Sequence, residues 1–175
     1  EKRMSAQLQF TMAGLGRMGA NIARRIQKHI DPATPVSISV FDVNADTVKS
    51  VAAEGFVGLS SLADLAQYNN DANPQIVWVM VPAEVTKDTI AKIAENLAPG
   101  STIIDGGNTF YRDDIANADW LAEKKINFVD VGTSGGVYGL DRGYSLMIGG
   151  EKAVVERLNP IFKALAPGIE SAERT

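Results

Sequence analysis

The feature that most constrains the fold is a set of three glycines between a strand-like and a helix-like segment. Leu8–Ala13 is apolar and typical of a strand, and Met18–His29 carries apolar residues at helical spacing. Between them, Gly14, Gly16 and Gly19 match the pattern GxGxxG. In this context the first glycine permits a tight turn, the second lets a phosphate approach the backbone, and the third lets the helix pack closely on the strand. The pattern predicts a helix that begins at a phosphate-binding turn.

We expect this turn to lie against the pyrophosphate of a dinucleotide. The N-terminus of the helix offers unpaired N–H groups and the positive end of a dipole to the phosphates. Arg17 could add charge there or extend into solvent, and the sequence favours neither. The residues predicted to form this phosphate cradle are Gly14, Leu15, Gly16, Arg17, Met18 and Gly19.

Strand-like and helix-like segments alternate along the rest of the chain. After the first strand, strands are expected at 36–41, 76–81, 101–104, 126–131 and 144–148, and the last helix at 154–165. Such alternation predicts an α/β fold with a Rossmann-like, doubly wound, mostly parallel sheet and helices on both faces. The 175 residues suit about one domain. We expect an N-terminal extension at 1–7, a dinucleotide-binding domain at 8–168 and a tail at 169–175.

Composition excludes several kinds of site. The chain has no cysteine and one histidine, so disulfides, thiolate metal sites and multi-histidine zinc sites are excluded, and we expect no metal. A net charge of -4 provides no overall positive field for nucleic acid or an anionic membrane. No apolar run approaches membrane-spanning length. We therefore expect a cytoplasmic protein whose partner is a small molecule, with no nucleic acid and no membrane.

Asp42 favours NAD over NADP as the cofactor. It ends the second predicted strand, where a carboxylate accepts hydrogen bonds from the adenosine ribose. It would also repel a 2′-phosphate, since two like charges about 4 Å apart interact by roughly 1 kcal/mol in water and roughly 4 kcal/mol at a partly shielded surface. The neighbouring Val43 and Asn44 provide no cation for such a phosphate. Alternatively Asp42 only caps the next helix, but Asn44 is better placed to do so.

Two further polar, glycine-rich stretches follow predicted strands. They are Asp105–Asn108 and Asp130–Gly136. The carboxyl ends of parallel strands meet at one edge of the sheet, where ligands bind, so we expect both stretches near the cofactor. For the same reason we expect Val81, Pro82 and Ala83 beside it. Backbone N–H groups in such loops bind oxyanions. Ordinary turn chemistry is the alternative, and it explains one such stretch more easily than two.

Three stretches together resemble the 6-phosphogluconate dehydrogenases, within the wider β-hydroxyacid dehydrogenase superfamily. They are GLGRMGANIARR from Gly14, DGGNTFYRDD from Asp105 and DVGTSGGVYGLDRGYSLMIGG from Asp130. The resemblance extends from about Leu8 to Gly168. The sequence is similar to the NAD-preferring branch of this family, because Asp42 stands where NADP-using relatives usually carry Asn-Arg-Thr.

The resemblance implies roles for residues on the substrate side. Asn108 would contact both the nicotinamide and the substrate, and Ser134, Gly135 and Gly136 would hold the carboxylate end of 6-phosphogluconate and the hydroxyls near its reacting carbons. The implied reaction is oxidation at C3 followed by loss of carbon dioxide, giving ribulose 5-phosphate in the pentose phosphate pathway. One position departs from the family: Ala83 leads directly into Glu84 without the usual glycine, so the contact of Ala83 is left open.

The resemblance also implies that this chain is inactive alone. The family's catalytic lysine and glutamate lie on a C-terminal helical domain, which we expect beyond residue 175, so no catalytic residue is expected in this chain. Lys152 and Lys163 are predicted to be solvated helix residues. The full-length form is expected to be a homo-oligomer. Two alternatives are a dehydrogenase of a smaller β-hydroxyacid and a non-catalytic nucleotide-binding module.

Overall fold

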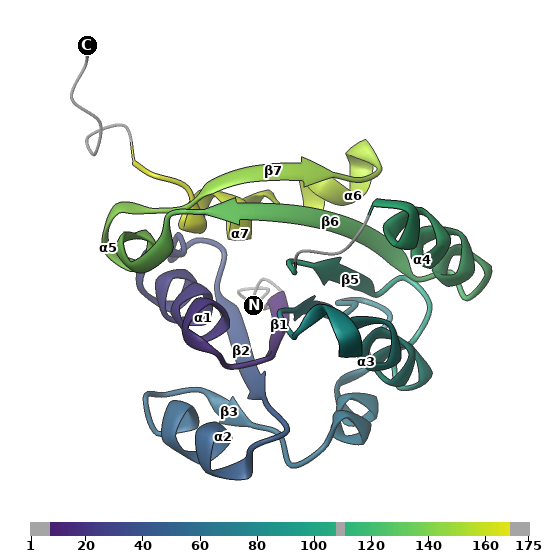
Figure 1. The fold of residues 1–175 in the computed structure, drawn as a ribbon, viewed down its shortest axis with the longest axis horizontal. Coiled ribbons are helices and arrows are strands. Elements are labelled where there is room, and N and C mark those ends of the chain that lie inside the picture. Colours follow the sequence, from purple (N-terminus) through teal and green to yellow (C-terminus); the bar gives the residue numbers. More distant parts are fainter. Residues whose placement is uncertain (1–7, 108–110, 169–175) are drawn as a thin grey trace, which may run out of the picture.

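A computed structural model of the protein describes residues 8–107 and 111–168. Within them, seven strands form one sheet in the order β3-β2-β1-β4-β5-β6-β7 (Figure 1). Strands β1 to β6 run parallel, and β7 is antiparallel to β6. This is the order and direction of a Rossmann-like sheet, which confirms the predicted fold. The predicted extension at 1–7, the tail at 169–175 and Asn108 lie outside the described residues.

Most elements lie where the periodicity predicted them. The strands are β1 (Leu8–Ala13), β2 (Val36–Phe41), β3 (Val57–Gly58), β4 (Ile76–Val79), β5 (Thr102–Asp105), β6 (Asn127–Ser134) and β7 (Ser145–Gly149). The helices are α1 (Arg17–His29), α2 (Ala45–Ala52), α3 (Ala83–Glu95), α4 (Tyr111–Glu123), α5 (Gly139–Arg142), α6 (Lys152–Arg157) and α7 (Asn159–Leu165), with 3-10 turns η1 (Leu62–Tyr68) and η2 (Gly136–Tyr138).

Strand β6 is longer than the prediction of 126–131. It continues because Thr133 pairs with Leu146 and Ser134 with Ser145 of the antiparallel β7. The segment predicted as a loop after this strand is therefore strand as far as Ser134. Pairing with the following strand, β7, extends β6 past the residues whose own hydrophobicity identifies it.

The predicted helix at 154–165 is divided in two. Helix α6 ends at Arg157, and α7 begins at Asn159 with Pro160 in its first turn. Proline has no N–H to continue the hydrogen-bond ladder of α6, but it is well suited to the first turn of a new helix. The two-residue β3 was not predicted, because an element this short has no measurable period.

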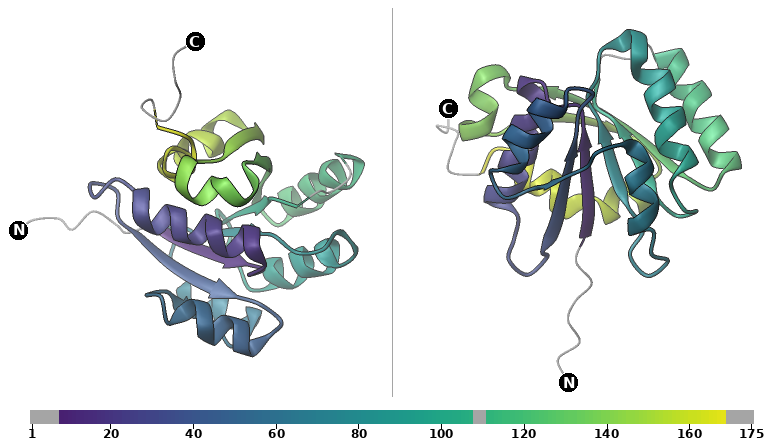
Figure 2. Two further views of the ribbon diagram at one scale, coloured as in Figure 1. Left: turned by 60° about the vertical axis from the view of Figure 1, so that its left-hand side comes forward. Right: turned by 90° about the horizontal axis from the view of Figure 1, so that it is seen from below.

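Helices lie on both faces of the sheet (Figures 1 and 2). All four residues of β4 are buried, as expected for a central parallel strand covered on both sides. The apolar core on the face of α1, α2 and α7 includes Phe10, Met12, Ile22, Ile26, Trp78, Ile104, Val129, Ile161, Phe162 and Leu165. The core on the face of η1, α3 and α4 includes Leu65, Val77, Val79, Ile90, Ile93, Ile103 and Leu121.

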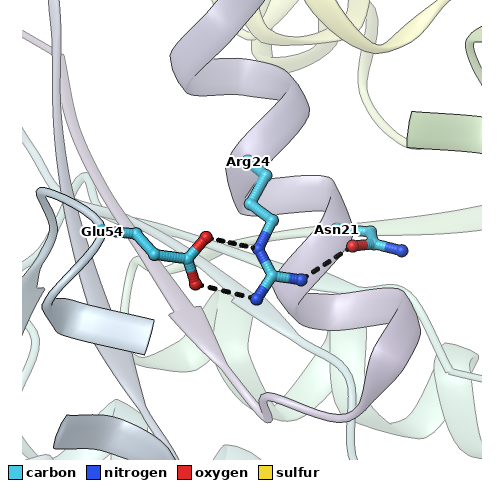
Figure 3. Close-up of polar contacts among 3 residues, drawn as sticks. All are labelled: Asn21, Arg24 and Glu54. Atoms are coloured by element: carbon cyan, nitrogen blue, oxygen red, sulfur yellow. Dashed lines mark hydrogen bonds and ion pairs between the residues drawn. The ribbon is translucent and has the colours of Figure 1, made fainter. Parts of the chain in front are cut away.

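Two consecutive arginines attach α1 to different neighbours. Arg24 forms a two-pronged ion pair with Glu54, just after α2, with both N···O distances 2.8 Å, and also donates to Asn21 (Figure 3). Arg25 is buried and donates to backbone carbonyls around α5 and α7. A partly exposed pair such as Arg24–Glu54 contributes at most about 1 kcal/mol to stability. The helix that begins at the glycine turn is thus held on two flanks.

Lys125 occupies a position that glycine would suit better. Helix α4 ends in a Schellman arrangement, in which Ile126 donates to Leu121 and Lys125 to Ala122. This arrangement puts Lys125 in the left-handed region, with a φ of 57°. A side chain there costs about 1–2 kcal/mol, because the Cβ crowds the following carbonyl.

We predict that Lys125→Gly raises the free energy of unfolding by about 0.5–1 kcal/mol. The relief of backbone strain outweighs the greater freedom of glycine in the unfolded chain. Urea unfolding would measure the gain. The matched control is Lys124→Gly. Lys124 has no positive φ and lies 5.4 Å from the Trp120 ring, so its replacement should destabilise. Equal losses in both variants would contradict the prediction.

Candidate functional site

The candidate site lies where the direction of the sheet connections changes. Strand β1 is flanked by β2 on one side and β4 on the other, so the chain crosses over at this point. In open α/β sheets a crevice forms outside the carboxyl ends of the strands at such a switch point, and ligands bind there. The glycine turn follows β1 directly, and the turn that begins at Met80 follows β4.

The three glycines of the turn serve different needs. Gly14 has a φ of +106°, and a Cβ there would overlap the Met80 carbonyl. A Cβ on Gly19 would overlap the carbonyl of Gly14. Gly16, in contrast, has an ordinary φ of -61°, and nothing lies within 4 Å of the position its Cβ would take. Packing within the protein therefore explains Gly14 and Gly19, whereas at Gly16 the absent side chain leaves open space in front of the backbone.

Helix α1 begins without a side-chain cap. Its N-cap is Gly16, no side chain accepts a hydrogen bond from its first turn, and that turn contains no acidic residue. Helix α2 differs, because the Asn44 side chain accepts the N–H groups of Asp46 and Thr47. The first N–H groups of a helix have no intrahelical partner, so those of α1 are available to an anion. Arg17 is exposed beside them.

Asp42 connects the end of β2 to the glycine turn. Its Oδ2 accepts the N–H of Leu15 at 2.8 Å, and its Oδ1 accepts the N–H of Asn44 at 2.9 Å. The cap of α2 is Asn44, as predicted, and not Asp42. A carboxylate has about four acceptor positions, so roughly two remain for hydroxyl groups of a ligand. Val43 beside it is 94% exposed.

The turn of Val81, Pro82 and Ala83 adjoins the glycine turn. Ala83 is the first residue of α3 and Pro82 its N-cap. The Val81 side chain lies 3.2 Å from the position a Cβ on Gly14 would take. The structure thus brings this predicted cofactor segment next to the phosphate cradle, along the same edge of the sheet.

The predicted substrate residues lie farther along this edge, at the end of β6. Ser134 is its last residue, and Gly135 and Gly136 follow with φ of 152° and 52°. These values favour glycine, so the backbone turn here depends on both residues. Ser134 and Gly136 are exposed. Between this turn and the cradle lie β4 and β5, and the DGGN stretch begins at the end of β5 with Asp105.

A pair of carboxyl groups near this edge was not identified from the sequence. Asp105 is 2% exposed, and its Oδ1 accepts the N–H of Gly107. Two carboxyl oxygens, Asp105 Oδ2 and Asp114 Oδ1, are buried, and neither has a hydrogen-bond donor in the described part of the chain. Asp114 lies on α4. Burial, then the hydrogen bond and charge of Asp105, with smaller contributions from Asp130 and Asp113, raise the pKa of Asp114 to about 7. We infer that protonated Asp114 donates a hydrogen bond to the Asp105 carboxylate.

Two cavities in the described part of the chain lie elsewhere. One of about 440 Å³ is lined by α4, the start of β6 and the start of α6, and one of about 410 Å³ by the starts of β1 and β2 and by residues of 67–73. Both adjoin the amino ends of parallel strands. We assign the site by the uncapped helix and the carboxyl strand ends instead, because dinucleotides bind along that edge of such sheets.

Several predicted properties stay predictions. No helix within residues 8–107 and 111–168 is long and apolar enough to cross a bilayer. In the same part of the chain, no group of three or more acidic or histidine residues is arranged to hold a metal ion. The cytoplasmic location, the oligomeric state and the lack of nucleic-acid and membrane partners stay predictions.

We predict that Asp114 makes stability fall as pH rises. Because its pKa is raised from 3.8 to about 7, the folded protein keeps a proton that the unfolded chain loses between about pH 4 and about pH 7. The free energy of unfolding should decline across this window and level off above it. Asp114→Asn should remove that decline and be the more stable protein at about pH 8, measured by urea unfolding.

The control for this experiment is Asp113→Asn, which changes an exposed carboxylate in the same helical turn. It should retain most of the decline. If Asp114→Asn followed the wild-type pH dependence, a protonated Asp114 would be the wrong interpretation of the pair.

Comparison with known proteins supports one family. A family model described as the NAD binding domain of 6-phosphogluconate dehydrogenase matches residues 9–172. The chain is 33% identical over 162 residues to the NAD(+)-dependent, decarboxylating 6-phosphogluconate dehydrogenase of Haloferax volcanii, covering 92% of this chain and 51% of that protein. It is 32% identical over 172 residues to the NADP(+)-dependent enzyme of Bacillus subtilis, covering 95% of this chain and 35% of that one.

Solved structures agree on the fold. The 6-phosphogluconate dehydrogenase of Plasmodium falciparum has a TM-score of 0.79 at 21% identity, covering 95% of this chain and 35% of that one. The 3-hydroxyisobutyrate dehydrogenase of Mycobacterium tuberculosis has a TM-score of 0.77 at 21% identity, covering 92% and 53%. The chain thus spans about half or less of the length of these proteins. It belongs to the family of the NAD binding domain of 6-phosphogluconate dehydrogenase.

Proposed function

We propose that this chain is the coenzyme-binding domain of an NAD-dependent 6-phosphogluconate dehydrogenase. The observation that carries the proposal is the uncapped first turn of α1 above the open space at Gly16, with Asp42 bonded to the same loop. The domain covers residues 8–168. Its relatives include enzymes named for NAD and for NADP at almost equal identity, so the choice of NAD rests on Asp42.

The dinucleotide fits the residues along this edge. The N–H groups of the first turn of α1 bind the pyrophosphate. Arg17, the first residue of this helix, adds positive charge beside them. The free acceptor positions of Asp42 bind the adenosine ribose hydroxyls, and the exposed Val43 lies beside the adenosine. The turn of 81–83 lines the continuation of the cofactor toward its nicotinamide end.

The substrate lies at the far end of the same edge. Ser134, Gly135 and Gly136 hold the carboxylate and nearby hydroxyls of 6-phosphogluconate, and Asn108 contacts both substrate and nicotinamide. Bound NAD supplies a hydride acceptor for oxidation at C3, after which the resulting keto acid loses carbon dioxide. The task of the protein here is to orient the C3 carbon against the nicotinamide, since fixed geometry lowers the entropic part of the barrier.

Lys152 and Lys163 do not have the surroundings expected of a catalytic lysine. These two lysines, the nearest to the C-terminal end of the chain, are exposed on α6 and α7, and Lys152 lies 3.9 Å from Glu156 of the same helix. Neither adjoins the carboxyl edge of the parallel strands. Under this proposal the chain binds the dinucleotide and contributes substrate contacts, and we expect little or no turnover by this chain alone.

We predict that Gly16→Ala separates binding from folding. Its backbone angles and surroundings accept a Cβ, so the thermal midpoint should stay within about 2 °C of the wild type. The added methyl group should block the approach of the pyrophosphate and weaken NAD binding by about tenfold or more. Calorimetric titration measures the affinity. Unchanged NAD affinity in a folded variant would exclude the cradle as the phosphate site.

We predict that this chain binds NAD more tightly than NADP, by a few-fold to several hundred-fold, because Asp42 repels a 2′-phosphate. The double variant Asp42→Asn with Val43→Arg removes that charge and adds a cation, so it should reverse the ratio. Val43→Gln, a neutral change at the same exposed position, is the control and should keep the wild-type order. Tighter NADP binding by the wild type would overturn the assignment of Asp42.

A further inference from the structure

Arg25 joins the cofactor side of the fold to the substrate side. We propose that it is a positioning residue, which holds the turn 135–143 after β6 against α1 and so sets where the substrate lies relative to the dinucleotide. This inference rests on the proposed function for its link to the substrate. Its structural part, the attachment of the turn, stands on the contacts of Arg25 alone.

The guanidinium of Arg25 binds three backbone carbonyls from two separate segments. Nε donates to Leu165 at 3.0 Å and Nη2 to Ala166 at 3.1 Å, both at the C-terminal end of α7. Nη1 donates to Leu140 of α5 at 3.0 Å. The last carbonyls of a helix have no intrahelical partner, so Arg25 supplies donors that α7 lacks. The planar fork of arginine places donors on three separate nitrogen atoms, whereas lysine and glutamine carry all their donors on one nitrogen and cannot reproduce this spacing.

The same contacts lock the turn in place. Tyr144 is fully buried and donates its N–H to Leu165, the carbonyl that Arg25 also binds. The Tyr144 ring lies against Gly139, where a Cβ would overlap it, and 3.1 Å from the position of a Cβ on Gly135. The substrate-side glycine turn, α5 and the end of α7 therefore form one packed unit, and Arg25 is its link to α1.

The charge of Arg25 has few partners. Arg25 is 4% exposed, and within the described residues no carboxylate lies within hydrogen-bond distance of it. Burial lowers the pKa of the guanidinium, with Tyr144 and then Asp141 opposing this. Carbonyls at a helix C-terminus carry partial negative charge and stabilise a cation there. Without this side chain the Leu140 and Ala166 carbonyls would lose the donor that Arg25 gives them, and the polar part of the attachment to α1 would be lost.

The position of Arg25 on α1 connects the turn 135–143 to the helix whose first turn forms the phosphate cradle. It lies eight residues after Arg17 on the helix, or about 12 Å along its axis, so the N-terminus that faces the dinucleotide and the anchor of the turn belong to one rigid element. Arg24 on the same helix attaches to Glu54 instead (Figure 3). Two neighbouring arginines thus hold different segments, and only Arg25 holds the substrate side.

The experiment compares Arg25→Gln, Arg25→Lys and the control Arg24→Gln in this chain. Three quantities are measured: the Kd for NAD, the amide hydrogen exchange of residues 135–143, and the Kd for 6-phosphogluconate with NADH present. In Arg25→Gln the turn should exchange about tenfold faster, and 6-phosphogluconate should bind about tenfold more weakly. The Kd for NAD should change by less than about twofold, because the cradle is untouched. Arg25→Lys should give an intermediate loss, and Arg24→Gln none.

Each outcome bears on one claim. Unchanged exchange in the turn, or equal losses of NAD and 6-phosphogluconate affinity in Arg25→Gln, would overturn the positioning role. The same losses in Arg24→Gln would reduce the effect to general destabilisation, which also overturns it. If the wild type bound NAD but not 6-phosphogluconate, the proposed substrate would fail, and the exchange of the turn would still decide whether Arg25 holds it.

Discussion

Backbone-to-backbone contact at the glycine turn determines where every other part of the site can lie. Gly14 abuts the Met80 carbonyl at the end of β4, and Gly19 abuts the carbonyl of Gly14, so a side chain at either position would separate the helix from the two central strands. This contact brings the uncapped end of α1 to the switch point of the sheet. A helix end held there must find its hydrogen-bond acceptors outside the protein, in water or in a ligand.

Asp42 has two tasks that act on the same atoms. Its carboxylate accepts the N–H of Leu15, which shapes the glycine turn, and in the proposed function its remaining lone pairs accept the ribose hydroxyls. A change of cofactor preference at this position therefore also changes the shape of the phosphate cradle. For this reason the compensating cation is better introduced at Val43, whose exposed side chain supports nothing else in the described part of the chain.

Much of the fold and of the cofactor side was predictable because its signals are local. The glycine pattern, the strand that precedes it and the cap at Asn44 each depend on residues close together in sequence. The extension of β6 to Ser134, the Asp105–Asp114 pair and the contacts of Arg25 were not predictable. They join residues separated by 9 to 141 positions, and a single sequence does not reveal which distant side chains meet. Arginine in a helix usually extends into solvent, so the residue type alone does not indicate that Arg25 is buried.

Two of these unpredicted contacts, the Asp105–Asp114 pair and the hydrogen bonds of Arg25, have a common consequence for the edge of the sheet. The buried carboxyl groups of Asp105 and Asp114 interact between the end of β5 and α4, and Arg25 joins the turn after β6 to α1. Each contact thus fixes a substrate-side segment to a helix on a different face of the sheet. Both use polar groups that are buried and hard to replace. Because Arg25 lies on the helix whose first turn is the phosphate cradle, the turn after β6 is fixed relative to that cradle, whereas the end of β5 is fixed to α4 by a separate interaction.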